Sequence, residues 1–248
     1  MTILGVDTST AIASVALIED GTLVGEETHV GSGTGYPGTA LPGRRTNHAE
    51  SLVPLIQSLL SRLEVTWEGI SALAVSIGPG SFTGLRIGLS TVKGLAYGWE
   101  VPVVGVPTLW AMAFRVTGWK GLVCPLLDAR KKEVYTALFR MQENGILVRL
   151  AEDEVCPPEV ILQKGKRWAG EPCLFIGDGM AVYGEAIRSL WGEGAVLSSG
   201  ESYPSTAYAV ARLAAVRLKE RAWDSAGQLA PVYLRPSEAE IKKGPGHA

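Results

Sequence analysis

The chain has 248 residues and a formal net charge of −2, and 46% of its residues are hydrophobic, 19% charged and 7% aromatic. This length allows one large domain or two small ones with a sizeable core, and the composition is typical of a soluble globular protein. The near-neutral charge argues against a global field that would attract the chain to nucleic acid or to an anionic membrane. No apolar run approaches the length of a membrane span, so we expect no membrane association.

The cysteines and the first residues indicate a cytoplasmic protein. Three cysteines are present, and none forms a Cys-x-x-Cys pair. An odd number of widely spaced cysteines predicts buried free thiols in a reducing compartment. The start of the chain lacks a basic segment, and Asp7 interrupts its apolar run, so it does not read as a signal peptide.

The first hundred residues alternate between strand and helix patterns. Apolar and β-branched runs at 2–6, 14–18 and 22–28, joined by tight turns, predict a three-stranded antiparallel meander. A Gly- and Pro-rich loop follows at 31–43. Asn47 and Glu50 form a capping box that opens a helix at 47–63 with one apolar face. A strand at 70–77, a helix at 83–97 and a strand at 101–106 complete this part.

The second part repeats the plan. The stretch DTSTAIASVALIEDGTLV and the stretch DARKKEVYTALFRMQENGILV both contain an Asp, a strand, an acidic-Gly turn and a strand. Later patterns predict a strand at 173–176, a helix ending near 191, and an Ala-rich helix at 206–223 with Ser205 as its cap. We therefore expect a duplicated α/β fold with domains at 1–106 and 107–235 and a flexible tail at 236–248. The helix at 206–223 is a candidate to pack back on the first domain.

The stretch IGPGSFTGLRIG resembles a phosphate-binding loop but meets neither common pattern. For a Walker loop, Gly80 and Gly84 are one step too close, and Leu85 stands where lysine is needed. For a dinucleotide fingerprint, Thr83 takes the place of the third glycine. Anion binding at the start of the following helix stays open, because helix N-termini attract anions.

That helix carries a second signal in its glycines. Gly84, Gly88, Gly94 and Gly98 lie in it or at its end, although an interior glycine costs roughly 1 kcal/mol relative to alanine. Glycines four residues apart let another helix approach closely, and the apolar residues leave only a narrow polar stripe. Two interpretations follow: a core helix of one domain, or a helix that docks on a partner beside the helix at 47–63.

Few residues are suited to catalysis. The three histidines, His29, His48 and His247, lack metal-ligand spacing, so we expect no metal site. Asp7 and Asp128 follow strands and could hold a hydrated Mg²⁺, or they could satisfy backbone N–H groups in the turns. The triplet at 130–132, RKK, is interpreted as a solvated hairpin.

Taken together, the motifs ILGVDTST, NHAESLVPLI, GPGSFTGLRIG, PVVGVPTL, LLDARKKEVY and PVYLR resemble those of the TsaB (YeaZ) family, in order, over about residues 3–235. The resemblance implies two duplicated domains of the actin/Hsp70/sugar-kinase-like (ribonuclease H-like) fold. It also implies a non-catalytic scaffold or activator subunit in the synthesis of N6-threonylcarbamoyladenosine at position 37 of tRNA. The alternative is an independent ATPase or small-molecule kinase, suggested by Asp7, Asp128 and the Gly177-Asp178-Gly179 turn.

The resemblance further implies the partners. They are a TsaD-like transferase and a TsaE-like ATPase, with tRNA bound only through the complex and with a homodimer through the same helices left open. No cofactor is required by this chain, and ATP or ADP is placed at the partner interface. The implied partner or dimer interface comprises His48, Leu52, Leu55, Ile56, Leu59, Gly80, Phe82, Thr83, Gly84, Arg86, Ile87, Gly88 and Thr91.

The sequence also departs from patterns of this fold. The catalytic paralogue has two metal-binding histidines in a Gly-Val-Asn-His-x-x-x-His pattern, and Thr108 and Met112 stand in their places here. Neither side chain replaces imidazole as a metal ligand. Ser9 stands where kinases of this fold have the glycine of Asp-x-Gly-x-Thr, which disfavours close approach of a phosphate. Asp7 and Asp128 are therefore candidates only for a vestigial phosphate or Mg²⁺ site.

Overall fold

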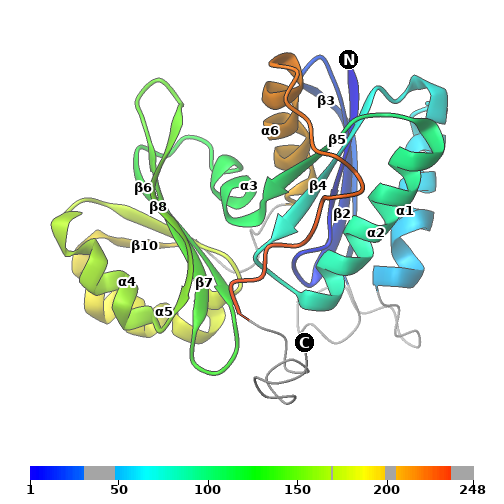
Figure 1. Cartoon of the computed structure of the whole chain (residues 1–248). Helices are drawn as coiled ribbons and strands as arrows, with labels where there is room; N and C mark the ends of the chain where they lie inside the picture. The colour runs from blue at the N-terminus through cyan, green and yellow to red at the C-terminus, as the bar shows by residue number, and fades with distance from the viewer. Residues whose placement is uncertain (31–47, 169, 199–204, 236–248) are drawn as a thin grey trace.

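The computed structural model describes residues 1–30, 48–168, 170–198 and 205–235. Its two halves lie side by side, each built on a five-stranded sheet with helices packed against it (Figure 1). Three expectations lie outside the described residues: the loop at 31–43, the cap at Asn47 and the tail from residue 236.

The first half contains the predicted meander. β1 pairs antiparallel with β2, β2 pairs antiparallel with β3, and the sheet continues through parallel β4 and β5 in the order β3-β2-β1-β4-β5. The prediction of a three-stranded antiparallel start is thus confirmed. The strands are β1 (Thr2–Asp7), β2 (Ile12–Glu19), β3 (Thr22–Val30), β4 (Ala72–Gly78) and β5 (Val103–Pro107).

Helices cover both faces of this sheet. Helices α1 (His48–Arg62) and α2 (Phe82–Trp99) pack on one face, and α6 (Ala207–Lys219) packs on the other (Figure 1). Successive residues of a strand point to opposite faces, so Leu4 joins the core under α1 and α2 while Ile3 joins the core under α6. The sheet is therefore buried on both sides.

Helix α6 is shorter than its pattern predicted. It ends at Lys219, and the cap residue is Thr206 rather than Ser205, without a side-chain capping bond. The Thr206 hydroxyl instead donates to the Asp7 carboxylate, and the Ser205 hydroxyl has no hydrogen-bond partner among the described residues. The Thr206 hydroxyl is thus bonded to the buried Asp7 carboxylate and does not cap the N-terminus of α6.

The second half repeats the topology of the first. Its sheet order is β10-β9-β6-β7-β8, which read from the other edge is β8-β7-β6-β9-β10. Counted within its own half, each sheet therefore has its strands in the order third, second, first, fourth, fifth. This identity confirms the predicted duplication. The elements are β6 (Gly121–Asp128), β7 (Val134–Met141), β8 (Leu147–Cys156), α4 (Pro158–Gly165), β9 (Cys173–Ile176), α5 (Gly179–Trp191) and β10 (Ala195–Leu197), with 3-10 turns at Trp67–Gly69, Lys166–Trp168 and Gly192–Gly194.

Between the halves lies α3 (Thr108–Phe114), which the sequence analysis did not predict. Its residue Ala111 belongs to the core under α6, while Leu109 and Met112 belong to the core of the second half. A seven-residue segment that is apolar on all sides, TLWAMAF, shows no helical periodicity, so the usual signal is missing. The helix joins the two cores into one packed unit.

Two further expectations can be compared with the structure. All three cysteines are buried and free, as predicted. Burial raises the pKa of the Cys124 thiol to about 12. Within the described ranges, no helix has the length and apolar character needed to cross a bilayer.

Candidate functional site

The glycine-rich loop before α2 packs against the turn between β1 and β2. A Cβ on Gly80 would lie 2.3 Å from the carbonyl oxygen of Ser9, and the Ser81 N–H donates to that same oxygen at 2.6 Å. The Ser81 hydroxyl accepts from the Gly84 N–H at 3.2 Å, and its carbonyl accepts from the Leu85 N–H at 2.9 Å. Three N–H groups of the loop are therefore already bonded within the chain. A phosphate cradle needs free N–H groups, so these three are not available to one.

The space beside Gly84 and Gly88 is filled by Thr8 of the same chain. A Cβ on Gly84 would lie 2.0 Å from the Thr8 carbonyl oxygen, and a Cβ on Gly88 would lie 2.3 Å from the Thr8 hydroxyl oxygen. Both glycines are buried. Their assignment to a partner interface is therefore corrected: they let α2 lie against Thr8, directly after β1, and not against another protein. By contrast, a Cβ on Gly94 or Gly98 would meet no atom within 4 Å.

Three residues of α1 are also unavailable to a partner. Leu52, Ile56 and Leu59 have 0% exposed surface and belong to the core between α1, α2 and the sheet. Their assignment to the interface is corrected for the same reason: the apolar stripe of an amphipathic helix is used first by the helix's own domain.

The remaining predicted interface residues reach the surface. Thr83 and Arg86 are exposed, and the partly exposed members are His48, Leu55, Gly80, Phe82, Ile87 and Thr91. The structure adds Ser90, Gly94 and Tyr97 to the exposed side of α2, with Tyr97 87% exposed. The exposed side of α2 is thus wider than the narrow polar stripe that the sequence indicated. We call the exposed side of α1 and α2, including these residues, the docking face.

The segment from 223 to 235, here called the C-terminal strap, leaves α6 and crosses the first half beside α2 (Figure 1). Lys93 of α2 donates to the carbonyl oxygens of Gly227 and Leu229 at 3.3 and 3.0 Å. The Val232 N–H donates to the carbonyl oxygen of Ile77 at 2.7 Å. At its end, Arg235 pairs with Glu133 of the second half. The strap therefore links the docking face to both halves.

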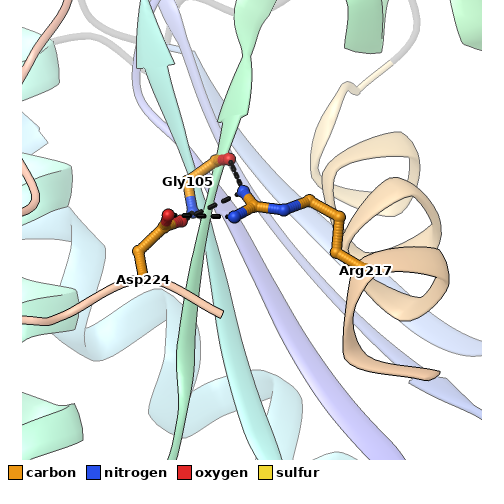
Figure 2. Close-up of polar contacts among 3 residues, drawn as sticks. All are labelled: Gly105, Arg217 and Asp224. Carbon is orange, nitrogen blue, oxygen red and sulfur yellow. Dashed lines mark hydrogen bonds and ion pairs between the residues drawn. The ribbon is translucent and has the colours of Figure 1, made fainter. Parts of the chain in front are cut away.

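A three-residue bracket fixes the start of the strap (Figure 2). Asp224 accepts from the Gly105 N–H at 2.7 Å and from both terminal nitrogens of Arg217 at 3.1 and 2.9 Å. Arg217 also donates to the Gly105 carbonyl oxygen at 3.1 Å. Burial alone would raise the pKa of Asp224, but the hydrogen bonds from Arg217 and Gly105 outweigh it and lower that pKa. The bracket ties the end of α6 to the edge strand β5.

A cleft of about 680 Å³ separates the two halves next to the glycine-rich loop, and its lining includes Ser9, His48, Gly80, Asp128, Tyr135 and Asp178. The His48 ring donates its Nε2 proton to the carbonyl oxygen of Thr10, 2.9 Å away. Asp178 accepts from the Asp128 N–H at 2.9 Å, and burial raises the pKa of Asp178. The lining also includes Arg130, whose guanidinium pairs with Asp128, so the cleft contains charges of both signs.

Asp7 and Asp128 do not fit a Mg²⁺ or phosphate site. Asp7 is buried, and its oxygens accept from the Ser9 N–H and from the hydroxyls of Ser76 and Thr206. Burial raises the pKa of Asp7 despite these bonds. One Asp128 oxygen accepts from the Arg130 N–H at 2.8 Å, and the other pairs with the Arg130 guanidinium at 3.1 Å. Both carboxylates satisfy their own turns, so the expected vestigial site receives no support.

Thr108 and Met112 occupy one turn of α3 and are buried between the halves. The Met112 methyl group lies 2.9 Å from the position that a Cβ on Gly177 would take, so it fills the space over the Gly177-Asp178-Gly179 turn. In the part of the chain that the structure describes, no three His, Cys, Asp or Glu side chains gather as metal ligands do. A thioether packed in the core takes the place of a metal ligand here.

Two halves of identical strand order, facing each other across a cleft, define this chain as a two-domain protein of the actin/Hsp70/sugar-kinase-like fold. A family model described as "TsaD: tRNA N6-adenosine threonylcarbamoyltransferase" matches residues 43–243. The chain is 34% identical to the tRNA threonylcarbamoyladenosine biosynthesis protein TsaB of Escherichia coli over 248 residues, which covers 99% of both chains. It belongs to the TsaB (YeaZ) family.

Two further similarities agree with this assignment. The TsaB protein of Bacillus subtilis is 30% identical over 243 residues, which covers 98% of this chain and 97% of the relative. The solved structure of YeaZ from Pseudomonas aeruginosa superposes with a TM-score of 0.76 at 29% identity, covering 94% of this chain and 99% of that one. The similarity therefore extends over both halves and is not confined to one motif.

Proposed function

We propose that this chain is a non-catalytic, cytoplasmic subunit of the machinery that makes N6-threonylcarbamoyladenosine at position 37 of tRNA. Its role is to bind and activate a TsaD-type transferase. The names of its relatives, tRNA threonylcarbamoyladenosine biosynthesis proteins, support the pathway. The match of residues 43–243 to the transferase family model supports a paralogous relation between the chain and its partner.

One observation carries the non-catalytic part of the proposal. Met112, at the position of a metal-binding histidine in the catalytic paralogue, is buried and fills the space against Gly177. Thr108, at the other such position, is also fully buried. Rebuilding a metal site would require imidazoles in a packed core and not merely a change of surface residues.

The docking face supports the proposed interaction. Its α2 side includes the small residues Thr83, Ser90 and Gly94, together with the exposed ring of Tyr97. Small side chains allow a second helix to approach closely, and an exposed aromatic ring is a common interface anchor. A TsaE-like ATPase joins this pair, tRNA binds only through the complex, and ATP or ADP lies at the partner interface. The chain itself requires no cofactor.

The test is reconstitution of tRNA modification from purified components. We expect threonylcarbamoyladenosine, measured by mass spectrometry of digested tRNA, to form efficiently only when this chain accompanies the transferase and the ATPase. The chain alone, given ATP, threonylcarbamoyl-AMP and tRNA, should form none. Product formed by the chain alone would contradict the non-catalytic assignment, and equal product without the chain would contradict the activating role.

A matched pair of variants tests the docking face. Ser90→Trp places a bulky ring at an exposed position of α2, and Ser189→Trp does the same at an exposed position of α5 in the second half. We expect Ser90→Trp to abolish co-purification with the transferase and Ser189→Trp to leave it unchanged. Size-exclusion chromatography with light scattering on the same variants shows whether a homodimer uses the same face. Unimpaired binding by Ser90→Trp would contradict docking through α2.

A further inference from the structure

Arg86 contacts two aromatic residues on the docking face, Phe82 and Tyr233. Its guanidinium carbon lies 3.9 Å from the centre of the Phe82 ring, four residues earlier on α2. Its Nε–H donates to the Tyr233 hydroxyl at 2.9 Å. The rings of Phe82 and Tyr233 stack with their centres 4.6 Å apart at 25°. The Phe82 ring and the hydrogen bond to Tyr233 thus orient the guanidinium, while the Tyr233 ring centre lies 5.8 Å from it.

The strap places Tyr233 in this stack. The bond from the Val232 N–H to the carbonyl oxygen of Ile77 fixes the backbone one residue before Tyr233. Arg235 anchors the backbone two residues after it, because its side chain donates to the Ala129 carbonyl oxygen at 3.0 Å and pairs with Glu133. The motif PVYLR therefore delivers one ring, from the far end of the chain, to α2.

Within the described residues, no carboxylate balances the charge of Arg86. Among residues 1–30, 48–168, 170–198 and 205–235, no carboxylate forms an ion pair with it, and its one hydrogen bond uses only Nε. Arg86 is an exposed residue, and no described group bonds its two terminal nitrogens. A guanidinium presents parallel donors that match the two oxygens of a carboxylate, and one that is already oriented loses little freedom on binding.

We propose that Arg86 is a preorganised carboxylate-binding fork. Its ligand is an aspartate or glutamate side chain on the transferase segment that packs against the docking face, and Tyr233 is its positioning residue. This inference rests on the proposed function. The ligand follows from charge complementarity, because an exposed cation without an ion-pair partner among the described residues favours a carboxylate. The neighbouring small residues Thr83 and Ser90 let a partner helix approach closely enough for a direct ion pair.

The test measures affinity for the cognate TsaD-type transferase by calorimetry, without nucleotide. We expect Arg86→Glu to weaken binding by about 30-fold or more, because truncating or reversing one member of an interface charge pair has effects of that size. Arg86→Lys keeps the charge but loses the fork, so it should recover only part of the affinity. Tyr233→Phe keeps the stack but removes the hydroxyl, and we expect roughly a fivefold loss. The loss caused by Arg86→Glu should shrink as salt rises.

Arg188→Glu, an exposed arginine on α5 in the second half, is the matched charge-reversal control and should bind like the unmodified chain. Melting temperatures of all variants show whether they fold. Binding by folded Arg86→Glu within twofold of the unmodified chain would overturn the inference. A dependence on Arg86 that appears only when ATP or ADP is added would also overturn it, because the ligand would then be a phosphate. If the unmodified chain fails to bind the transferase at all, the proposed function fails instead.

Discussion

The Thr8 hydroxyl donates to the carbonyl oxygen of Gly84 at 2.7 Å and lies 2.3 Å from the position that a Cβ on Gly88 would take. This contact joins the turn after β1 to α2 across 76 residues of sequence. It explains why α2 has glycines at positions 84 and 88, one turn apart, although glycine lowers the stability of a helix. The same contact makes these glycines poor reporters of partner binding, because their substitution disturbs the chain's own core first.

Gly88→Ala should therefore destabilise the isolated chain. The new methyl group would displace the buried Thr8 hydroxyl, and overpacking of this kind costs about 1–3 kcal/mol of unfolding free energy. Urea denaturation measures the effect. Gly94→Ala is the matched control: it lies on the same helix with no atom near its Cβ position, so it should stabilise the chain by up to about 1 kcal/mol. If both variants change stability equally, Thr8 is not the cause.

Arg235→Ala should loosen the connection between the strap and the second half. It removes the ion pair with Glu133 and the hydrogen bond to the Ala129 carbonyl oxygen, so we expect a loss of about 1–3 kcal/mol and faster amide exchange at 129–133. Hydrogen exchange read by mass spectrometry locates the change. Arg140→Ala removes a more exposed ion pair with Glu171 and should cost less than about 1 kcal/mol. Unchanged exchange at 129–133 would show that the strap does not hold the second half.

The turn held by Arg235 contains three successive non-glycine residues in the left-handed region. The φ angles of Arg130, Lys131 and Lys132 are 61°, 55° and 63°. Left-handed residues other than glycine cost roughly 1–2 kcal/mol each. Lys132→Gly should therefore raise the unfolding free energy by about 1 kcal/mol, measured by denaturant titration. A loss of stability would indicate that the lysine side chain contributes more than its backbone strain costs.

Asp7 should impose a pH dependence on stability. Burial raises its pKa in the folded chain above the ordinary value near 4, so the folded chain takes up a proton at a higher pH than the unfolded chain does. Folding is therefore favoured by acid over the range between the two pKa values. The unfolding free energy of the unmodified chain minus that of Asp7→Asn should therefore increase as the pH is lowered from 7 towards 4. A difference that is constant over this range would mean that the pKa of Asp7 is not raised.

Much of the fold could be predicted from local pattern. The alternation of β1 and β2, the apolar stripe of α1 and the repeated strand-turn-strand units indicated both halves and their duplication. Helix α3 was not predicted because it is apolar on every side. Helix α6 was predicted too long because the pattern runs to 223, whereas the helix ends at Lys219 and Arg221 has a left-handed φ of 56°. Periodicity shows where a helix face must be buried, but an element without a polar face gives no period to detect.

The candidate site was less predictable. The sequence singled out the docking helices, the failed phosphate patterns and the unusual Thr108 and Met112, because these are properties of residue type and spacing. Which side of α2 each glycine faces was decided only by folding, when Thr8 came to fill the space beside Gly84 and Gly88. The fork at Arg86 likewise depends on Tyr233, 147 residues away, which no local pattern connects to it. Residue type determines which interactions a side chain can make. Only the long-range packing of the chain decides whether the side chain makes them within the molecule or is exposed to a partner.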